Sequence, residues 1–147
     1  MKKLISLVLV LLCVLALVGC NNKSSTIKGS EVYSFPEPTT QITGSYCSQG
    51  TENTFVIGSE EYNPDDLSTH PIIEWFYGLE LRECEIPETV EGNETYSFTV
   101  KDRVVFEYDY RGNTAFLIVN EKWYEVQNPT VPPLDETQMS PEKVIAE

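Results

Sequence analysis

Residues 95–127 contain runs of alternating apolar and polar side chains separated by turn-forming residues, and this pattern constrains the fold more than any other feature of the chain. Side chains of period two point to opposite faces of a strand, so the stretch predicts a sheet with one buried and one wet face. Turn-forming residues at 101–102, 111–113 and 120–121 divide it into four runs. The third run, Ala115 to Val119, is apolar throughout, which indicates a central strand. The sequence therefore predicts a four-strand antiparallel meander.

The residues before the meander predict three more strands and one helix. Strands are expected at 42–47, 54–58 and 79–86, where short apolar runs are bounded by turn-forming residues. Asn63 followed by Pro64 is a helix start signal and predicts a turn or short helix at 64–68. A second helical piece is expected at 69–78, because its apolar residues recur at helical spacing on one stripe. They are Ile72, Trp75, Phe76 and Leu79.

One domain of the α+β class follows from these elements, with a mostly antiparallel sheet packed against one short helix. All sixteen aromatic residues lie between Tyr33 and Tyr124, and we place the domain at residues 41–127. The chain of 147 residues has ten Lys and Arg against 23 Asp and Glu, a net charge of -13. Beyond the first three residues no two basic side chains are adjacent, so nucleic acid is excluded as a partner.

The first twenty residues, MKKLISLVLVLLCVLALVGC, predict an export signal at residues 1–19. The alternative is a transmembrane helix, but the apolar run from Leu4 to Val18 is short for a span and polar residues follow it. Leu17-Val18-Gly19-Cys20 resembles the bacterial lipobox, which implies that Cys20 carries lipid and begins the mature chain. We therefore expect a protein anchored to the membrane by lipid on its extracytoplasmic face.

Two segments flank the predicted domain. Residues 20–40 comprise the lipidated cysteine and a stretch rich in Ser, Thr, Asn and Pro that we interpret as a flexible spacer. Residues 128–147 contain four prolines without a clear period and are expected to form an irregular tail. Besides the lipid-bearing Cys20, two cysteines, Cys47 and Cys84, are expected in the mature chain. Outside the cytosol they are expected to form a disulfide; the alternative is two separate buried thiols.

Catalytic motifs are missing from the sequence, and we expect a protein that is not an enzyme and needs no cofactor or metal. His70, the single histidine, is expected to be a partly exposed residue at the helix start. The alternatives are a general base in a hydrolase and a zinc ligand together with Cys47 and Cys84.

Six glutamates between residues 80 and 94 form the densest acidic stretch of the chain. A solvated surface is one interpretation; the other is a field that attracts a cationic protein or peptide, or calcium. Tyr77 and Trp123 are aromatic candidates for an interaction surface, and core packing explains them equally well. The candidate surface comprises Tyr77, Glu80, Glu83, Glu85, Trp123 and Tyr124.

The stretch HPIIEWFYGLELRECEIPETVEGNETYSFTV and its continuation FEYDYRGNTAFLIVNEKWYEVQNP resemble a small domain of uncharacterised lipoproteins from Gram-positive anaerobic bacteria. More loosely, they resemble the extracytoplasmic tail of membrane regulators similar to the antibiotic sensor BlaR. Neither resemblance implies an activity, ligand or catalytic residue. Tyr46-Cys47 followed by a glycine turn is similar to the opening of membrane-bound lysozyme-inhibitor lipoproteins, whose downstream glycine loop signature this chain lacks.

These observations lead to an expected function and two alternatives. We expect a lipid-anchored extracytoplasmic protein that serves as a non-catalytic binding or accessory module. The first alternative is an inhibitor of a cationic cell-wall hydrolase such as lysozyme, which the acidic net charge would suit. The second is a hydrolase that uses His70.

Overall fold

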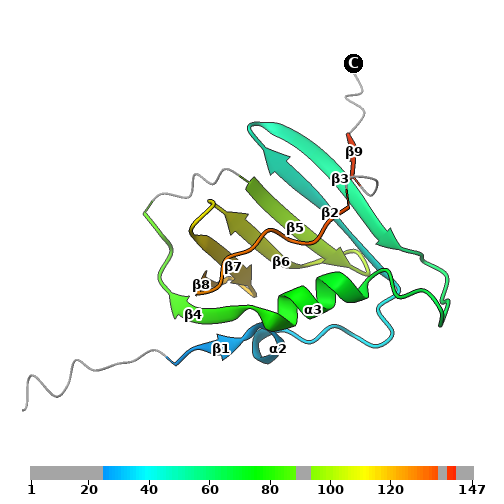
Figure 1. Ribbon diagram of the computed structural model, residues 1–147, viewed down its shortest axis with the longest axis horizontal. Helices are drawn as coiled ribbons and strands as arrows, with labels where there is room; N and C mark the ends of the chain where they lie inside the picture. Colours follow the sequence, from blue (N-terminus) through cyan, green and yellow to red (C-terminus); the bar gives the residue numbers. More distant parts are fainter. Residues whose placement is uncertain (1–24, 89–93, 136–138, 142–147) are drawn as a thin grey trace, which may run out of the picture.

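The computed structural model describes residues 25–88, 94–135 and 139–141 of the chain. It contains an antiparallel sheet of nine strands in the order β1-β4-β8-β7-β6-β5-β2-β3-β9 (Figure 1). The strands are β1 (Ile27–Lys28), β2 (Gln41–Ser48), β3 (Thr51–Gly58), β4 (Glu80–Cys84), β5 (Glu94–Val100), β6 (Arg103–Tyr110), β7 (Ala115–Val119), β8 (Lys122–Val126) and β9 (Met139–Pro141). The helices are α2 (Gly29–Val32) and α3 (His70–Gly78).

The predicted α+β class is confirmed, and strands β5 to β8 form the predicted meander. Two of its hairpins turn through two residues with positive φ, Lys101-Asp102 and Asn120-Glu121. Such turns follow the right-handed twist of the flanking strands, so strand pairing continues on both sides. Strand β7 lies between β6 and β8, as its apolar composition predicted.

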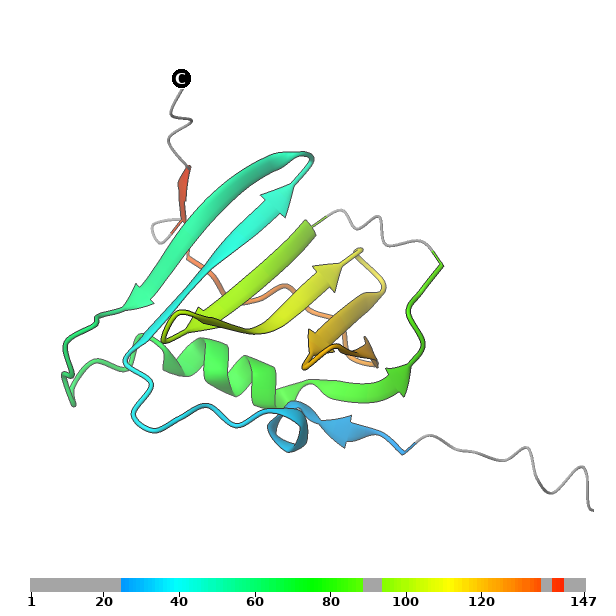
Figure 2. The ribbon, with the colours of Figure 1, turned by 180° about the vertical axis from the view of Figure 1, so that it is seen from behind.

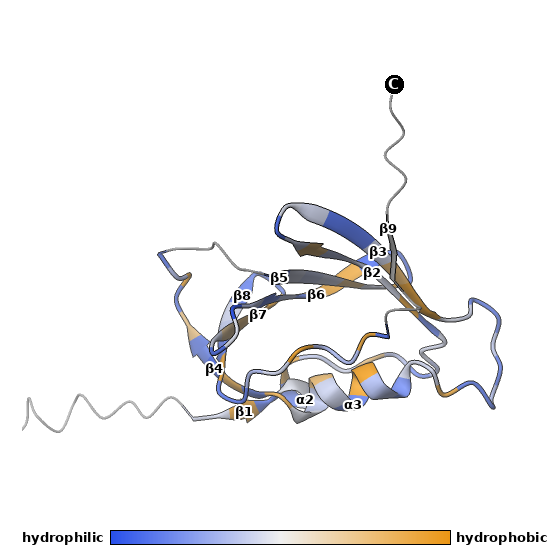
Figure 3. Ribbon diagram, turned by 45° about the horizontal axis from the view of Figure 1, so that its top comes forward, coloured by the Kyte–Doolittle hydropathy of each residue, from blue (hydrophilic) through white to orange (hydrophobic). Residues whose placement is uncertain are grey.

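One face of the sheet, here called the inner face, carries the core. Both helices lie on this side of the sheet (Figure 3). Ile72, Phe76 and Leu79 of the predicted helical stripe are buried, and Trp75 is half-buried against the same core. The Phe76 ring lies 4.5 Å from that of Phe106 on β6. Alternation in the strands and helical spacing in α3 therefore direct their apolar side chains to one shared core.

The segment predicted as a flexible spacer is part of the domain over its described residues. Strand β1 pairs with β4, and the buried Gly29 donates its backbone N–H to the carbonyl oxygen of Leu79 at 3.1 Å. A Cβ at Gly29 would lie 1.9 Å from the Phe76 carbonyl oxygen, so only glycine fits. Phe35 is buried among aromatic rings. The domain thus begins no later than Ile27, where the sequence predicted residue 41.

The segment predicted as an irregular tail also belongs to the domain over much of its length. Residues 127–134, here called the C-terminal crossover, pass over the inner face from β8 toward β3, and β9 then pairs with β3 (Figures 1 and 2). The Tyr108 hydroxyl donates to the Thr130 carbonyl oxygen at 2.8 Å. Pro132 is buried. Hydrogen bonds and one proline therefore fix a segment that has no strand periodicity.

Cys47 and Cys84 are both free thiols. They lie on β2 and β4, and four strands separate these in the sheet. Neighbouring strands are about 4.8 Å apart, so five spacings place the cysteines about 24 Å apart along the sheet. A disulfide requires Cα atoms within about 7 Å. The predicted bridge is not formed, because the fold places the two cysteines near opposite edges of one sheet.

Candidate functional site

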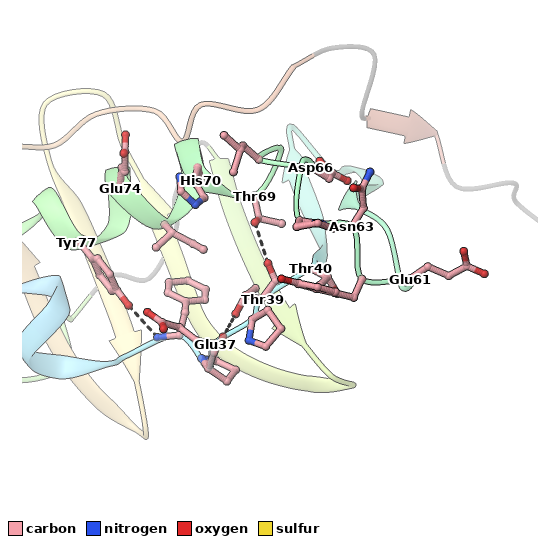
Figure 4. Close-up of a pocket in the computed structure, with 17 residues that line it drawn as sticks. Glu37, Thr39, Thr40, Glu61, Asn63, Asp66, Thr69, His70, Glu74 and Tyr77 are labelled. Atoms are coloured by element: carbon pink, nitrogen blue, oxygen red, sulfur yellow. Dashed lines mark hydrogen bonds between the residues drawn. The ribbon is translucent and has the colours of Figure 1, made fainter.

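A cleft with a volume of about 870 Å³ lies beside α3 (Figure 4). Three stretches of chain form its walls: residues 35–40, residues 61–67 of the loop before α3, and the face of α3 that carries His70, Ile73, Glu74 and Tyr77. The volume is in the range of pockets that hold small organic ligands or a few side chains of a partner. This cleft is the candidate functional site.

Residues 35–40 form a wall that is fixed to α3 at both ends. Phe35 is 6% exposed, and its ring lies in edge contact with Phe76 at 5.6 Å between centroids. Its backbone N–H donates to the Tyr77 hydroxyl at 3.1 Å. Near the start of α3, the buried Thr69 donates its hydroxyl to the Thr39 carbonyl oxygen at 2.9 Å (Figure 4). This wall is therefore held without depending on a ligand.

The loop before α3 forms the second wall and is shaped by side-chain to backbone hydrogen bonds. The Asn63 side-chain oxygen accepts from the backbone N–H of Asp65 at 3.1 Å, and Asp66 accepts from the backbone N–H of Ser68 at 2.9 Å. For residues 64–68 the sequence predicted a turn or a short helix, and the structure has turns there. The loop leaves two large apolar side chains in solvent, Tyr62 (66% exposed) and Leu67 (59% exposed).

The third wall is one face of α3. His70, Glu74 and Tyr77 recur at the i, i+4 and i+7 positions that align side chains on a helix, and Ile73 lies beside them. Pro71 occupies the first turn of the helix, where its missing N–H costs no hydrogen bond within the helix. Its opposite side is buried through Ile72 and Phe76. The same helix therefore supports the core and presents polar side chains to the cleft.

The residues that line the cleft carry an excess of negative charge. Its lining contains four carboxylates, Glu37, Glu61, Asp66 and Glu74, and no lysine or arginine. The ion pairs within residues 25–88 and 94–135 use other carboxylates, those of Glu80, Glu83, Asp109 and Glu125. His70 is the only side chain in the lining that could carry a positive charge. The cleft therefore combines apolar surface with an excess of negative charge.

The six residues predicted as one interaction surface lie in separate places. Tyr77 lines the cleft, whereas Tyr124 is buried on the inner face of β8. Glu80 forms an ion pair with Lys28 at 2.9 Å. Glu83, Glu85 and Trp123 line a shallower hollow of about 530 Å³ at the far end of β4.

His70 lines the cleft, but neither cysteine does. Cys84 lies beside the hollow at the end of β4, and Cys47 is exposed on β2. Within residues 25–88 and 94–135, no three His, Cys, Asp or Glu side chains are grouped so that they could hold a metal ion. The alternative of a zinc site built from His70, Cys47 and Cys84 is wrong, because the fold does not bring these residues together.

The lipobox residues Leu17, Val18, Gly19 and Cys20 lie outside the described residues. Across the described part of the chain, neither helix has the length and apolarity that crossing a bilayer would need. Comparison with protein families, characterised proteins and solved structures found no match to this chain.

Sequence reasoning missed two of the three walls of the cleft. Residues 35–40 have the composition of a linker, and only the buried Phe35 and its neighbouring prolines distinguish them from one. Tyr62 and Leu67 could have been selected from the sequence, because two large apolar residues in a polar turn region are typical of a contact surface. Tyr77 was selected from the sequence as an aromatic contact, and it is the one member of that set in the cleft.

Proposed function

We propose that this chain is a lipid-anchored protein on the outer face of the cytoplasmic membrane, where its domain acts as a non-catalytic binding module through the cleft. The observation that supports binding is the cleft itself, with fixed walls, exposed apolar side chains and carboxylates without ion-pair partners. The anchor is supported by the apolar N-terminal segment that ends in Leu17-Val18-Gly19-Cys20.

The fold constrains where such an anchor would hold the domain. Only residues 21–26 separate Cys20 from Ile27, the first residue of β1. An extended chain covers at most about 3.6 Å per residue, so these residues and the two flanking links span about 25 Å or less. The domain would therefore stay close to the bilayer instead of moving on a spacer of twenty residues. Strand β1 and the adjacent β4 would be its nearest part.

The anchor is tested by replacing Cys20 with Ala and separating membrane and soluble fractions of the cells. We expect the variant to carry no lipid and to be absent from the membrane fraction that detergent extracts. Cys47→Ala is the matched control, because it removes an exposed cysteine within the domain and should leave the distribution unchanged. If Cys20→Ala remains lipidated and the protein stays in the membrane fraction, the proposed anchor is wrong.

Binding at the cleft is tested by photo-crosslinking in intact cells. A photoreactive amino acid at Leu67 lies in the cleft, and one at Val104, which is 60% exposed on β6, lies outside it. We expect a defined adduct from position 67 that position 104 does not give. Equal labelling patterns from both positions would contradict a binding role for the cleft.

The alternative of a hydrolase inhibitor is favoured by the hollow at the end of β4. Trp123 lines this hollow together with three glutamates and one cation, Lys122, which pairs with Glu83. A cationic enzyme would be attracted to such a surface, and salt would weaken the attraction. The test measures lysozyme activity with the full chain at low and high salt, and repeats it with Glu85→Lys. Full lysozyme activity at low salt would eliminate this alternative without contradicting the proposed binding function of the cleft.

A further inference from the structure

We infer that the domain rests on the lipid bilayer through one end of its sheet, where Ile86 and Trp123 enter the membrane interface, and that the cleft faces away from the membrane. The partner of this surface is the bilayer itself. The inference rests on the proposed lipid anchor and adds the orientation of the anchored domain. It depends on where the chain enters the domain, on the side chains at that place, and on the distribution of charge.

The chain enters the domain beside the end of β4. Strand β1 pairs antiparallel with β4, with Ile27 opposite Leu81. A strand antiparallel to β4 begins on the side toward which β4 runs, and β4 runs toward Ile86. Leu81 and Ile86 are five residues apart, about 17 Å or less along an extended chain. Since the residues between Cys20 and Ile27 span up to about 25 Å, the lipid on Cys20 can lie level with Ile86.

Two side chains at this end of the sheet suit a membrane interface. Ile86 follows β4 and is 66% exposed, and no large apolar side chain of the described residues is more exposed. Trp123 is half-buried on β8 opposite Cys84, and it lines the same hollow as Ile86. Tryptophan is enriched at membrane interfaces, because its ring is apolar and its indole N–H is polar. Contact with lipid would remove apolar surface of both side chains from water.

The carboxylates of this hollow are compatible with contact to lipid. Glu83 forms an ion pair with Lys122 at 3.5 Å. Glu85 and Glu121 can stay in the headgroup layer, which is polar and about 5–7 Å deep on each side of the hydrocarbon core. The hollow is also the surface that the alternative of a hydrolase inhibitor would need. A domain that rests on the bilayer at this place has no room there for an enzyme.

The charge of the domain is divided in a way that favours the same orientation. Residues 29–81 contain nine Asp and Glu and no lysine or arginine. Lys28, Arg82 and Lys122 lie on the adjacent strands β1, β4 and β8, and each forms an ion pair with a glutamate. An anionic bilayer repels the part of the domain without cations more strongly than the end where these cations lie.

The cleft lies toward the opposite end of the molecule. From left to right in Figure 1, β1, α2 and α3 follow one another, and the loop before α3 lies beyond the start of that helix; Figure 2 shows the same order from behind. Between Gly78 and His70, α3 extends about 12 Å away from β1 at 1.5 Å per residue. With the end of β4 on the bilayer, Tyr62 and Leu67 of the cleft are therefore turned toward the outside.

The experiment places the full lipidated chain on the outer surface of phosphatidylcholine vesicles whose acyl chains are brominated near the headgroup, because bromine quenches a nearby indole. Trp75→Phe leaves Trp123 as the only tryptophan, and Trp123→Phe leaves Trp75, which is half-buried on the inner face. Relative to vesicles without bromine, we expect the emission of Trp123 to fall by about twofold or more. The emission of Trp75 should stay unchanged.

A matched pair of positions measures the orientation. Both tryptophans are replaced by Phe, and a single new one is introduced by Ile86→Trp or by Tyr62→Trp. The two positions are equally exposed in the domain, at 66%, so only their distance from the lipid differs. We expect quenching by about twofold or more at position 86 and none at position 62. Equal quenching at both positions, or stronger quenching at position 62, would overturn the inferred orientation.

A charge at the inferred contact tests whether Ile86 takes part in it. Ile86→Glu should abolish most of the quenching of Trp123, because a carboxylate is costly to bring into the membrane interface. Leu67→Glu is the matched control, since it adds the same charge at a side chain of the cleft that is 59% exposed, and it should leave the quenching unchanged. Full quenching of Trp123 in Ile86→Glu would mean that the assigned contact is wrong.

Cys20→Ala separates failure of the orientation from failure of the anchor. If the lipidated chain binds the vesicles through Cys20 but Trp123 is not quenched, the anchor stands and the inferred surface is wrong. If the chain carries no lipid, or if Cys20→Ala binds the vesicles as tightly, the proposed anchor is wrong and the inference falls with it. If binding requires Cys20 and quenching is confined to Trp123 and position 86, both are supported.

Discussion

Two segments from opposite ends of the chain close the helix side of the sheet, and they are held by different forces. Residues 27–40 are held mainly by buried apolar contacts, with Gly29 against the end of α3 and Phe35 among four aromatic rings. The C-terminal crossover, residues 127–134, is held mainly by hydrogen bonds. Asn128 bonds to Gly78 and Glu80, and Thr130 bonds to Tyr108 and Trp75.

The two kinds of contact predict different effects on the stability of the domain when either segment is disrupted. Removing a buried aromatic side chain leaves a cavity in a packed core, so damage to residues 27–40 affects the whole domain and one wall of the cleft. Hydrogen bonds of partly exposed groups contribute less in net terms, because water replaces the lost partner. The C-terminal crossover should therefore be able to loosen while the rest of the domain stays folded.

The largest effect is expected for Phe35→Ala. Loss of a buried phenylalanine ring costs about 3–5 kcal/mol of unfolding free energy, and urea unfolding of the variant measures it. Phe116→Ala is the matched control, since Phe116 is half-buried on the outer face of the sheet and should cost less. Equal losses for the two variants would show that residues 27–40 are not held by the core.

The second effect is a loss of stability at alkaline pH through Tyr108, beneath the crossover. Burial raises the pKa of Tyr108 to about 12 from the ordinary value of 10. The hydroxyl is neutral in both states below pH 10, so the stability is complete there. Between pH 10 and 12 the Tyr108 hydroxyl ionises in the unfolded chain but stays neutral in the folded chain. The unfolding free energy therefore falls by about 2–3 kcal/mol.

Urea unfolding between pH 8 and 12 measures this loss, and Tyr108→Phe separates it from other groups. The variant should have a smaller slope above pH 10, although burial also raises the pKa of Tyr96. A slope identical to that of the wild type would contradict the role assigned to Tyr108.

A smaller effect is expected for Asn128→Ala. The side chain of Asn128 accepts from the Glu80 backbone N–H at 2.7 Å and donates to the Gly78 carbonyl oxygen at 3.1 Å. Its loss should cost about 1 kcal/mol and increase hydrogen exchange in residues 127–134 more than in the meander. Asn113→Ala, at an exposed turn, should change neither quantity. A uniform increase in exchange across the sheet would mean that the crossover does not loosen by itself.

The smallest effect is expected for Thr130→Val, which removes the hydroxyl that accepts from the Trp75 indole N–H at 3.0 Å. The backbone bonds between Thr130 and Tyr108 remain, so the loss should be about 0.5 kcal/mol. Fluorescence of Trp75, measured in a Trp123→Phe background, should change in the variant because the indole loses its partner. An unchanged spectrum would show that this contact is not maintained in solution.

Much of the sheet could be predicted because its residues repeat. The meander, β2, β3 and β4 follow from alternation and turn residues, and α3 follows from the spacing of Ile72, Phe76 and Leu79. The two flanking segments could not be predicted in this way. Their positions depend on single contacts, such as Phe35 in its ring cluster and Thr130 over Tyr108, which leave no periodic pattern in the sequence.

The candidate site shows the same division. Tyr77 and His70 could be selected from the sequence, since a tyrosine on an amphipathic helix and a single histidine at its start are visible without coordinates. Their common cleft could not, because two of its walls are a proline-containing segment and a polar loop that reach α3 only in the folded chain. The expected pairing of Cys47 with Cys84 failed for a related reason, since sequence separation says nothing about the number of strands between two positions in a sheet.

The sequence by itself determined the antiparallel meander, the helix that covers it and the acidic character of the domain, because alternation, helical spacing and net charge are local or additive properties of the residues. The tertiary structure alone decided which carboxylates share a cleft, which segments form its walls, and that Cys47 and Cys84 lie near opposite edges of the sheet. These depend on long-range packing, where a single buried ring or hydroxyl determines the path of a whole segment.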